Sequence, residues 1–346
     1  MISAEAAAWA LRLFVGREPT DEAEVEFHRG HPDMESLRRC FAGTIEFRNF
    51  LDTSVLARPT YAIPPFLLRP PANPAFPTLF EEPSLAHPVS QLCTASQFDE
   101  PEFATWCEAL KLSPDHHRKI WEFCYVTSVM EAAGVLRPGN RALGFGCGTE
   151  PIPAMLARLG LDVMATDAPH DIIAGQGWDS TNQFTRGLQD LEKPAIVDRA
   201  TFHARVSFRP VDMNAIPDDL RDFDVCWSSC AFEHLGSIAH GLDFFENSLR
   251  TLKPGGIAVH TTEFNLQSND DTYEDTALSL FRKRDIEALL ARLAEAGHEV
   301  WPLNLHPGTA LVDEHIDLPP YAMPHLKLRV ATYVTTSIGL VVRKRA

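Results

Sequence analysis

The chain has 346 residues, of which 45% are hydrophobic and 23% charged, so a globular protein is expected and a collagen-like or wholly disordered chain is excluded. Its formal net charge of −16 disfavours contact with a phosphate backbone, so nucleic acid is not an expected partner. The 7 cysteines are scattered and contain no Cys-x-x-Cys pair, which favours a reducing, cytoplasmic location.

The first 57 residues predict a small helical accessory domain, because apolar side chains recur there at helical spacing. Glu5 and Arg12 interrupt the apolar start of the chain, so no signal peptide is predicted. No stretch approaches the run of roughly 18 apolar residues that a membrane-spanning helix needs, so the chain is not expected to be integral to a membrane.

Prolines dominate the next segment. Nine of them fall between residues 58 and 90, and they exclude a regular helix and favour extended geometry. We therefore predict a proline-rich linker over 58–95, with a second domain over 96–346.

Strand and helix patterns alternate through that second domain, and this alternation predicts a doubly wound α/β fold. A further helix is predicted around 180–191, in the long connection after the second strand. The predicted strands are 141–145, 161–166, 206–211, 224–228, 256–262, 298–303 and 332–342, and the other predicted helices are 114–134, 152–159, 237–252 and 284–296.

The most informative local pattern is the glycine-rich turn between the first predicted strand and its helix, Leu143-Gly-Phe-Gly-Cys-Gly-Thr-Glu150. Glycines at such a turn let the backbone approach a ligand closely, and Asp167 at the end of the next strand can accept hydrogen bonds from ribose hydroxyls. Together they predict a nucleoside site. Neither glycine frame completes the G-x-G-x-x-G pattern of a dinucleotide loop.

With these residues the chain resembles the class I S-adenosylmethionine-dependent methyltransferases, whose first motif is an acidic residue followed by G-x-G-x-G. Gly146, Gly148 and Asp167 match that motif, whereas Gly144 stands at the usual acidic position and Glu150 at the usual third glycine. The resemblance covers roughly residues 114–344. It implies a Rossmann-like methyltransferase fold: a mostly parallel seven-stranded sheet with an antiparallel last strand, preceded by the small helical unit.

The resemblance also implies a cofactor site for S-adenosylmethionine, which leaves as S-adenosylhomocysteine. The segment Val211-Asp-Met213 resembles the one that holds the adenine, 223–229 resembles the fourth strand beside the active site, and Glu150 is expected to supply the carboxylate that Gly144 lacks. The predicted cofactor contacts are Gly146, Cys147, Gly148, Glu150, Asp167, Ala168, Asp212, Met213 and Ser229.

Transfer of the methyl group to a hydroxyl needs a base, because the hydroxyl proton must leave. The pair Glu233-His234 follows the fourth strand and resembles a recurring pair of the family, so His234 is the first candidate for the base and Glu233 its partner. Glu263, near the end of the fifth strand, is a second choice. His260 on the same strand is more often a structural hydrogen-bonding residue than a base.

The long insert before the last strand holds carboxylates and imidazoles that can bind a divalent metal, yet acidic surface loops are commonly just solvated. A metal is therefore an alternative and no metal ligand is predicted. The same insert, together with Trp178, could form a substrate lid. The insert residues concerned are Asp313, Glu314, His315, Asp317 and His325.

The N-terminal segments 14–19 and 44–47 resemble a small helical domain found beside bacterial glycosyltransferases and surface proteins, which implies work on glycans. The sequence thus predicts an O-methyltransferase whose acceptor is a sugar or polysaccharide. Two alternatives stay open: a methyltransferase for a small natural product, and a binding module without catalysis. Acceptor atom, metal need and any homo-oligomer are not fixed by these residues.

Overall fold

The computed structural model describes residues 2–47, 60–71, 75–169, 184–185 and 187–346. The chain forms two compact units, 1–60 and 61–346, so most of the proline-rich segment lies within the larger one. The helix expected over 180–191 falls partly outside the described residues, and Trp178 lies entirely outside them. No helix in the described ranges is long and apolar enough to cross a membrane.

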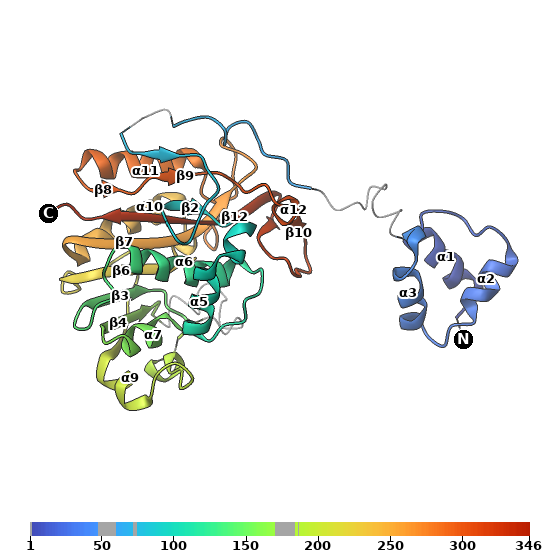
Figure 1. The fold of residues 1–346 in the computed structure, drawn as a ribbon. Coiled ribbons are helices and arrows are strands. Elements are labelled where there is room, and N and C mark those ends of the chain that lie inside the picture. Colours follow the sequence, from blue (N-terminus) through green and yellow to red (C-terminus); the bar gives the residue numbers. More distant parts are fainter. Residues whose placement is uncertain (1, 48–59, 72–74, 170–183, 186) are drawn as a thin grey trace. The chain divides into compact units, whose positions relative to one another are not determined.

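Three helices make up most of the described smaller unit, as its apolar spacing predicts (Figure 1). Each begins at a side chain that accepts a hydrogen bond from the helix's own backbone: Ser3, Asp21 and Asp33. The helices are α1 (Ala4–Phe14), α2 (Glu22–Arg29) and α3 (Met34–Ala42). Their small common core consists of Ile2, Ala7, Ala10, Leu11, Val15, Leu37 and Phe41.

The larger unit is built on a sheet whose central order is β12-β7-β6-β3-β4-β5 (Figure 1). The strands from β7 to β5 are parallel, and β12 runs antiparallel to β7. This order confirms the predicted Rossmann-like methyltransferase fold with its antiparallel last strand. The strands are β3 (Arg141–Phe145), β4 (Asp162–Asp167), β5 (Val206–Pro210), β6 (Phe223–Ser229), β7 (Leu252–Asn265) and β12 (Tyr333–Arg343).

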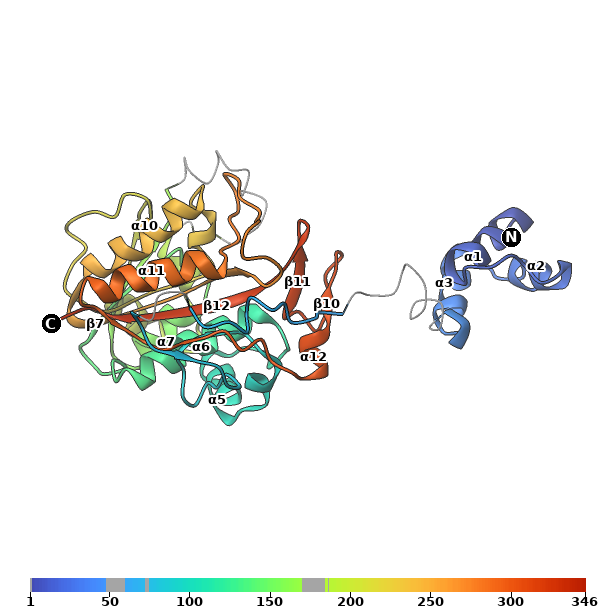
Figure 2. The same cartoon turned by 90° about the horizontal axis from the view of Figure 1, so that it is seen from above.

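Helices cover both faces of the sheet (Figure 2). Along β7 the buried side chains alternate, because successive residues of a strand point to opposite faces. Ile257 and Val259 pack in the core under α6 and α7, and Ala258 packs in the core under α10 and α11. The helices are α5 (Pro101–Leu110), α6 (Arg118–Ala132), α7 (Ile152–Arg158), α9 (Arg199–Arg205), α10 (Ile238–Ser248) and α11 (Lys283–Glu295).

The edge beyond β12 differs from the sequence prediction. The strand expected over 298–303 is divided into β8 (Glu299–Val300), which pairs with β12, and β9 (Leu303–Asn304). Pro302 lies between them and has no N–H to donate, which interrupts the ladder. Two strands from the proline-rich segment, β1 (Thr78–Leu79) and β2 (Ser90–Leu92), pair with β9.

The insert before β12 forms the short elements α12 (Leu311–Glu314), β10 (Ile316–Asp317) and β11 (Lys327–Val330), and β11 pairs with β12. Its carboxylates mostly face inward. Asp313 is buried and accepts a hydrogen bond of 3.0 Å from the backbone N–H of Ala95, so the insert is tied to the segment that precedes α5.

Candidate active site

The glycine-rich turn joins β3 to α7 at the carboxyl end of the sheet. Gly146 and Gly148 have φ values of 59° and 51°, a left-handed conformation that glycine adopts without strain. A Cβ on Gly146 would lie 2.8 Å from the Cβ of Ala231, in the segment after β6. Glycine is therefore required here both by the backbone angle and by the close approach of the neighbouring loop.

Asp167 ends β4 beside this turn and is buried. Its carboxylate accepts hydrogen bonds from the backbone N–H groups of Gly148 (3.1 Å), Ala168 (2.8 Å) and Thr185 (2.9 Å). Burial raises the pKa of Asp167, and these three hydrogen bonds oppose the shift. A carboxylate has about four lone-pair positions, so one remains for a ligand hydroxyl.

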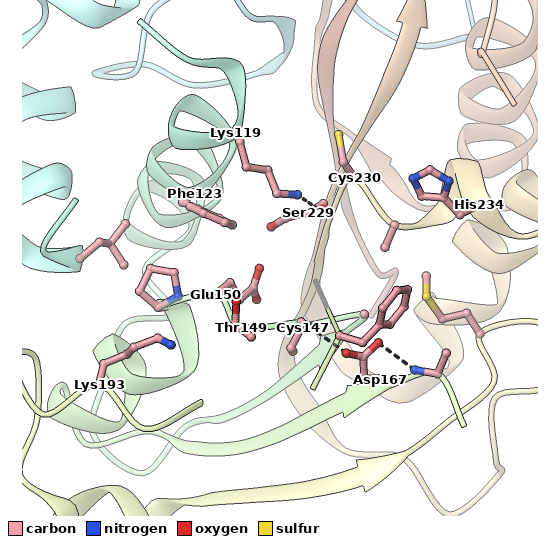
Figure 3. Close-up of a pocket in the computed structure, with 18 of the residues that line it drawn as sticks. Lys119, Phe123, Cys147, Thr149, Glu150, Asp167, Lys193, Ser229, Cys230 and His234 are labelled. Atoms are coloured by element: carbon pink, nitrogen blue, oxygen red, sulfur yellow. Dashed lines mark hydrogen bonds between the residues drawn. The ribbon is translucent and has the colours of Figure 1, made fainter. Parts of the chain in front are cut away.

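A cavity of about 640 Å³ opens at the carboxyl ends of β3, β4, β5 and β6 (Figure 3). In a parallel sheet these ends meet at the same edge, which is where such folds bind ligands. All the residues predicted to contact the cofactor line this cavity: Gly146, Cys147, Gly148, Glu150, Asp167, Ala168, Asp212, Met213 and Ser229.

The two departures from the methyltransferase motif are linked through Trp227. A Cβ on Gly144 would lie 2.5 Å from Cζ2 of Trp227 and in close contact with Cys147 Sγ, so no acidic side chain fits at 144. The indole Nε1 of Trp227 donates a hydrogen bond of 2.6 Å to Oε1 of Glu150. The indole thus occupies the space that an acidic side chain at position 144 would need, and it holds the carboxylate of Glu150 by a hydrogen bond.

Glu150 is 6% exposed and faces the cavity. Burial raises its pKa to about 7, against the Trp227 hydrogen bond and the charge of Lys119, which lower it. A carboxylate that titrates near neutrality inside a cavity suits a cationic ligand, because the cation favours the ionised form.

His234 lines the cavity next to the end of β6 (Figure 3). Its Nδ1 lies 2.6 Å from the carbonyl oxygen of Ala277, so Nδ1 donates there and Nε2 carries the lone pair. Burial lowers the pKa of His234 to about 4, which keeps the ring neutral near pH 7. In this tautomer the neutral ring can accept a proton at Nε2.

The other two predicted catalytic residues are placed behind the cavity wall and do not line it. Glu233 accepts a hydrogen bond of 3.0 Å from Thr262, and its Oε1 lies 4.0 Å from His234 Nε2. Burial raises the pKa of Glu233 to about 7. Glu263 forms an ion pair with Arg118. From there Glu233 can interact electrostatically with the His234 ring, whereas Glu263 is paired with Arg118.

His260 is a structural residue, as the sequence favours. It is fully buried, and its ring nitrogens form hydrogen bonds of 2.8 Å with Ser228 and 3.1 Å with Ser248. Burial lowers its pKa to about 3, so the ring stays neutral.

The carboxylates of the insert make internal contacts. Asp313 pairs with Lys327 at 3.3 Å, and Asp317 pairs with Nδ1 of His325 at 2.5 Å. Within the residues that the structure describes, the insert gathers no three metal-binding side chains at one point. These contacts explain the two carboxylates as structural side chains of the insert.

Two further walls of the cavity lie outside the motifs, and sequence reasoning missed Phe123 in the first wall and all of the second. One comes from α6, where Lys119 and Phe123 stand one helical turn apart on the cavity face, and the Lys119 ammonium lies 5.5 Å from the Phe123 ring centre. The other is the segment 192–196 after the 3₁₀-helix 188–191. Helical spacing in the sequence indicates the wall formed by α6, but no motif indicates the wall formed by 192–196.

Residues 143–260, about a third of the chain, match the family model described as a methyltransferase domain. This match supports S-adenosylmethionine as the cofactor, as the motif resemblance implies. The sequence matches no curated protein.

Solved structures resemble the larger part of the chain at low identity. They include the magnesium protoporphyrin IX methyltransferase of Synechocystis PCC 6803 with bound SAH (13% identity, 63% of this chain, 80% of that one, TM-score 0.38). TehB of Haemophilus influenzae (16%, 64% and 62%, 0.39) and the CcbJ methyltransferase of Streptomyces caelestis (14%, 62% and 94%, 0.36) are similar in degree. TM-scores below 0.5 are too low to transfer a function.

Gly144→Ala is expected to destabilise the larger unit by about 1–3 kcal/mol, because the added methyl group overlaps Trp227 and Cys147. Denaturant unfolding followed by tryptophan fluorescence measures the loss. Adding Cys147→Ala removes one of the two obstacles and should recover part of it. Unchanged stability of Gly144→Ala would contradict the packing described for Trp227.

Proposed function

We propose that the chain is an S-adenosylmethionine-dependent methyltransferase that methylates a hydroxyl group of a sugar or polysaccharide. The observation that carries the proposal is the convergence on one cavity of every residue predicted to contact the cofactor, with His234 at the same cavity. The cavity volume of about 640 Å³ is in the usual range for small-molecule sites.

The donor set of the cavity fits this cofactor. Asp167 has one lone-pair position left for a ribose hydroxyl. After the end of β5, Asp212 offers a polar contact and Met213 an apolar contact for the adenine ring. Glu150 provides the negative charge that the positively charged methionine end of the cofactor requires.

The cofactor supplies a methyl group on a sulfonium, which is already activated for transfer. The protein's tasks are to align the acceptor oxygen with that methyl carbon and to take its proton. When the acceptor hydroxyl reacts, His234 Nε2 would receive its proton. The cofactor, held by Asp167 and Glu150, would supply the methyl group and leave as S-adenosylhomocysteine. Glu233 Oε1 lies 4.0 Å from His234 Nε2, and in its ionised form it stabilises the resulting imidazolium, whose charge in turn favours that form.

The sugar acceptor rests on the resemblance of the N-terminal unit to a domain found beside glycosyltransferases and on the predicted base for a hydroxyl. The test is an acceptor screen with nucleotide sugars, oligosaccharides and small natural products, read as S-adenosylhomocysteine released. Turnover with sugars alone supports the proposal, and turnover with natural products alone would replace it. Tight cofactor binding without turnover on any acceptor would favour a binding module.

Asp167→Asn should weaken S-adenosylmethionine binding about 10- to 100-fold, because the charged acceptor for the ribose hydroxyl is lost. Isothermal calorimetry measures the Kd. Asp162→Asn is the matched control, since Asp162 lies on the same strand, is exposed and pairs with Arg205 at 2.8 Å. An unchanged Kd in Asp167→Asn would remove Asp167 from the site.

The affinity for S-adenosylmethionine should rise with pH, up to about tenfold from pH 6 to pH 8, as Glu150 ionises around its pKa of about 7. The sign follows from the ligand, since a cation binds the ionised carboxylate and not the neutral acid. Glu150→Gln should abolish this dependence. Glu233→Gln is the control, because Glu233 titrates in the same range but lies outside the cavity lining. A pH-independent Kd of the unaltered protein would contradict this role of Glu150.

His234→Gln should lower kcat about 10²- to 10⁴-fold while the Kd of the cofactor changes less than about twofold, the pattern of a lost general base. His240→Gln is the control, because this exposed histidine forms a hydrogen bond from its ring to the carbonyl oxygen of Leu235 and does not line the cavity. Full activity of His234→Gln would refute the assignment.

A further inference from the structure

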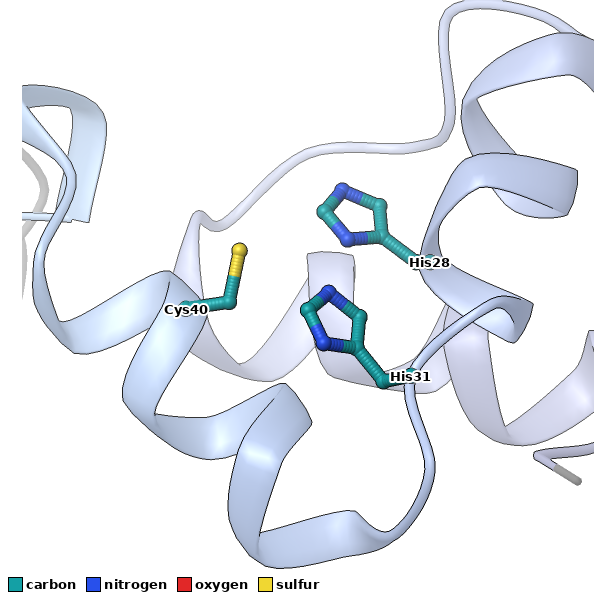
Figure 4. Close-up of side chains that lie close together, drawn as sticks. All are labelled: His28, His31 and Cys40. Carbon is teal, nitrogen blue, oxygen red and sulfur yellow. The ribbon is translucent and has the colours of Figure 1, made fainter.

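Three side chains of the smaller unit meet at a point that the proposed methyl transfer does not use. They are His28 in the last turn of α2, His31 just after that helix, and Cys40 in α3. One nitrogen or sulfur atom of each lies within 4.8 Å of the others. Figure 4 shows the two imidazole rings and the Cys40 sulfur facing a common space.

His28 is the most informative of the three. It is 8% exposed, and its ring stacks on Phe41 with centroids 4.4 Å apart. Its Nδ1 is buried without a hydrogen-bond partner among the described residues. A buried polar atom without a partner destabilises the fold unless something binds it, and an ion is one of the recognised explanations.

His31 is oriented for the same point by its neighbour. Its Nδ1 lies 3.3 Å from the hydroxyl oxygen of Ser36, at the start of α3. When Nδ1 donates that hydrogen bond, Nε2 carries the lone pair. A hydrogen bond from the second ring nitrogen is the usual way in which a protein fixes the tautomer and angle of a metal-binding histidine.

We propose that His28, His31 and Cys40 bind one divalent transition-metal ion, with Zn²⁺ as the expected occupant. Imidazole nitrogen and thiolate sulfur are the ligands that Zn²⁺ prefers, and they do not suit Mg²⁺ or Ca²⁺, which take oxygen. The Cys40 thiol loses its proton to solvent when the sulfur–metal bond forms. With three protein ligands, the fourth tetrahedral position is left for water.

The spacing fits such an ion after small side-chain movements. Bond lengths of about 2.0–2.1 Å to nitrogen and 2.3 Å to sulfur place tetrahedral ligand atoms roughly 3.3–3.7 Å apart. Closing the separations of up to 4.8 Å to that value requires shifts of about 1 Å. Rotation about the side-chain bonds of Cys40 and His31, both half-buried, provides this movement.

The ion would stabilise the smaller unit, whose core is small. Its described core contains only small and medium apolar side chains apart from Phe41, and Cys40 is not in a disulfide. Units of this size commonly need a metal or disulfides to supplement the core. An ion held by His28, His31 and Cys40 ties the end of α2 to α3.

The test uses the full chain, first stripped with a chelator and then titrated with Zn²⁺. Alkylation of Cys40 with iodoacetamide, followed by peptide mass spectrometry, should slow about tenfold or more at saturating Zn²⁺, because a bound thiolate is not free to react. Cys230 is the internal control, since it is also half-buried but belongs to no group of three metal-binding side chains among the described residues, and its labelling should not change. Equal labelling of Cys40 with and without Zn²⁺ would overturn the proposal.

A second measurement is independent of thiol labelling. The chain should retain about one Zn²⁺ after dialysis, and His28→Asn and Cys40→Ser should each lose it, while His87→Asn, at an exposed histidine outside the site, should not. Circular dichroism of the metal-free variants checks that their helices persist. Retention of the ion by both His28→Asn and Cys40→Ser would place it elsewhere and overturn the proposal.

Discussion

The contact between Trp227 and Gly144 is the constraint on which the active-site cavity depends. Trp227 on β6 is fully buried, and its indole packs against its cross-strand partner Gly144 on β3, which leaves no space for a side chain at position 144. Its only polar atom must find a hydrogen-bond acceptor, and that acceptor is Glu150. One packing choice in the sheet therefore fixes the place of the carboxylate at the start of α7.

The same edge of the sheet carries a buried set of charges on α6. Glu122 is fully buried, and Ser337 donates to its Oε1 at 2.5 Å. Although burial opposes ionisation, Lys119 and Arg118 hold the pKa of Glu122 below its usual range. Removing Glu122 would take the carboxylate partner from Lys119 and one of two from Arg118, which is costly in such surroundings. This requirement holds Lys119 at the cavity wall.

Much of the larger unit could be predicted from its sequence, because the spacing of apolar residues indicates which face of each helix or strand is buried. β3 has the predicted bounds, and β4 to β7 and β12 lie within a few residues of them. The cavity residues Gly146, Gly148 and Asp167 were predictable for a different reason, since a tight turn and a strand end restrict which residue types can stand there. The backbone angles of the two glycines agree with that argument.

What the sequence did not predict depends on contacts between distant segments. The pairing of β1 and β2 with β9 joins residues more than two hundred positions apart, and no local pattern encodes it. The inward position of Asp313 depends in the same way on Lys327 and on the backbone of Ala95. A helical face gave a hint of Lys119 and Phe123, but which face meets the cavity is decided by the packing of α6 on the sheet.

The protonation states of the cavity follow one rule. In the absence of a ligand, burial favours the neutral form of each group, so it raises the pKa of Glu150 and Glu233 to about 7 and lowers that of His234 to about 4. Under the proposed function, a cationic cofactor reverses this preference at Glu150, which lines the cavity, whereas Glu233 does not line it and faces His234 instead. In that proposal, the cavity gains its negative charge at the cofactor site, and the neutral His234 accepts the proton of the acceptor hydroxyl.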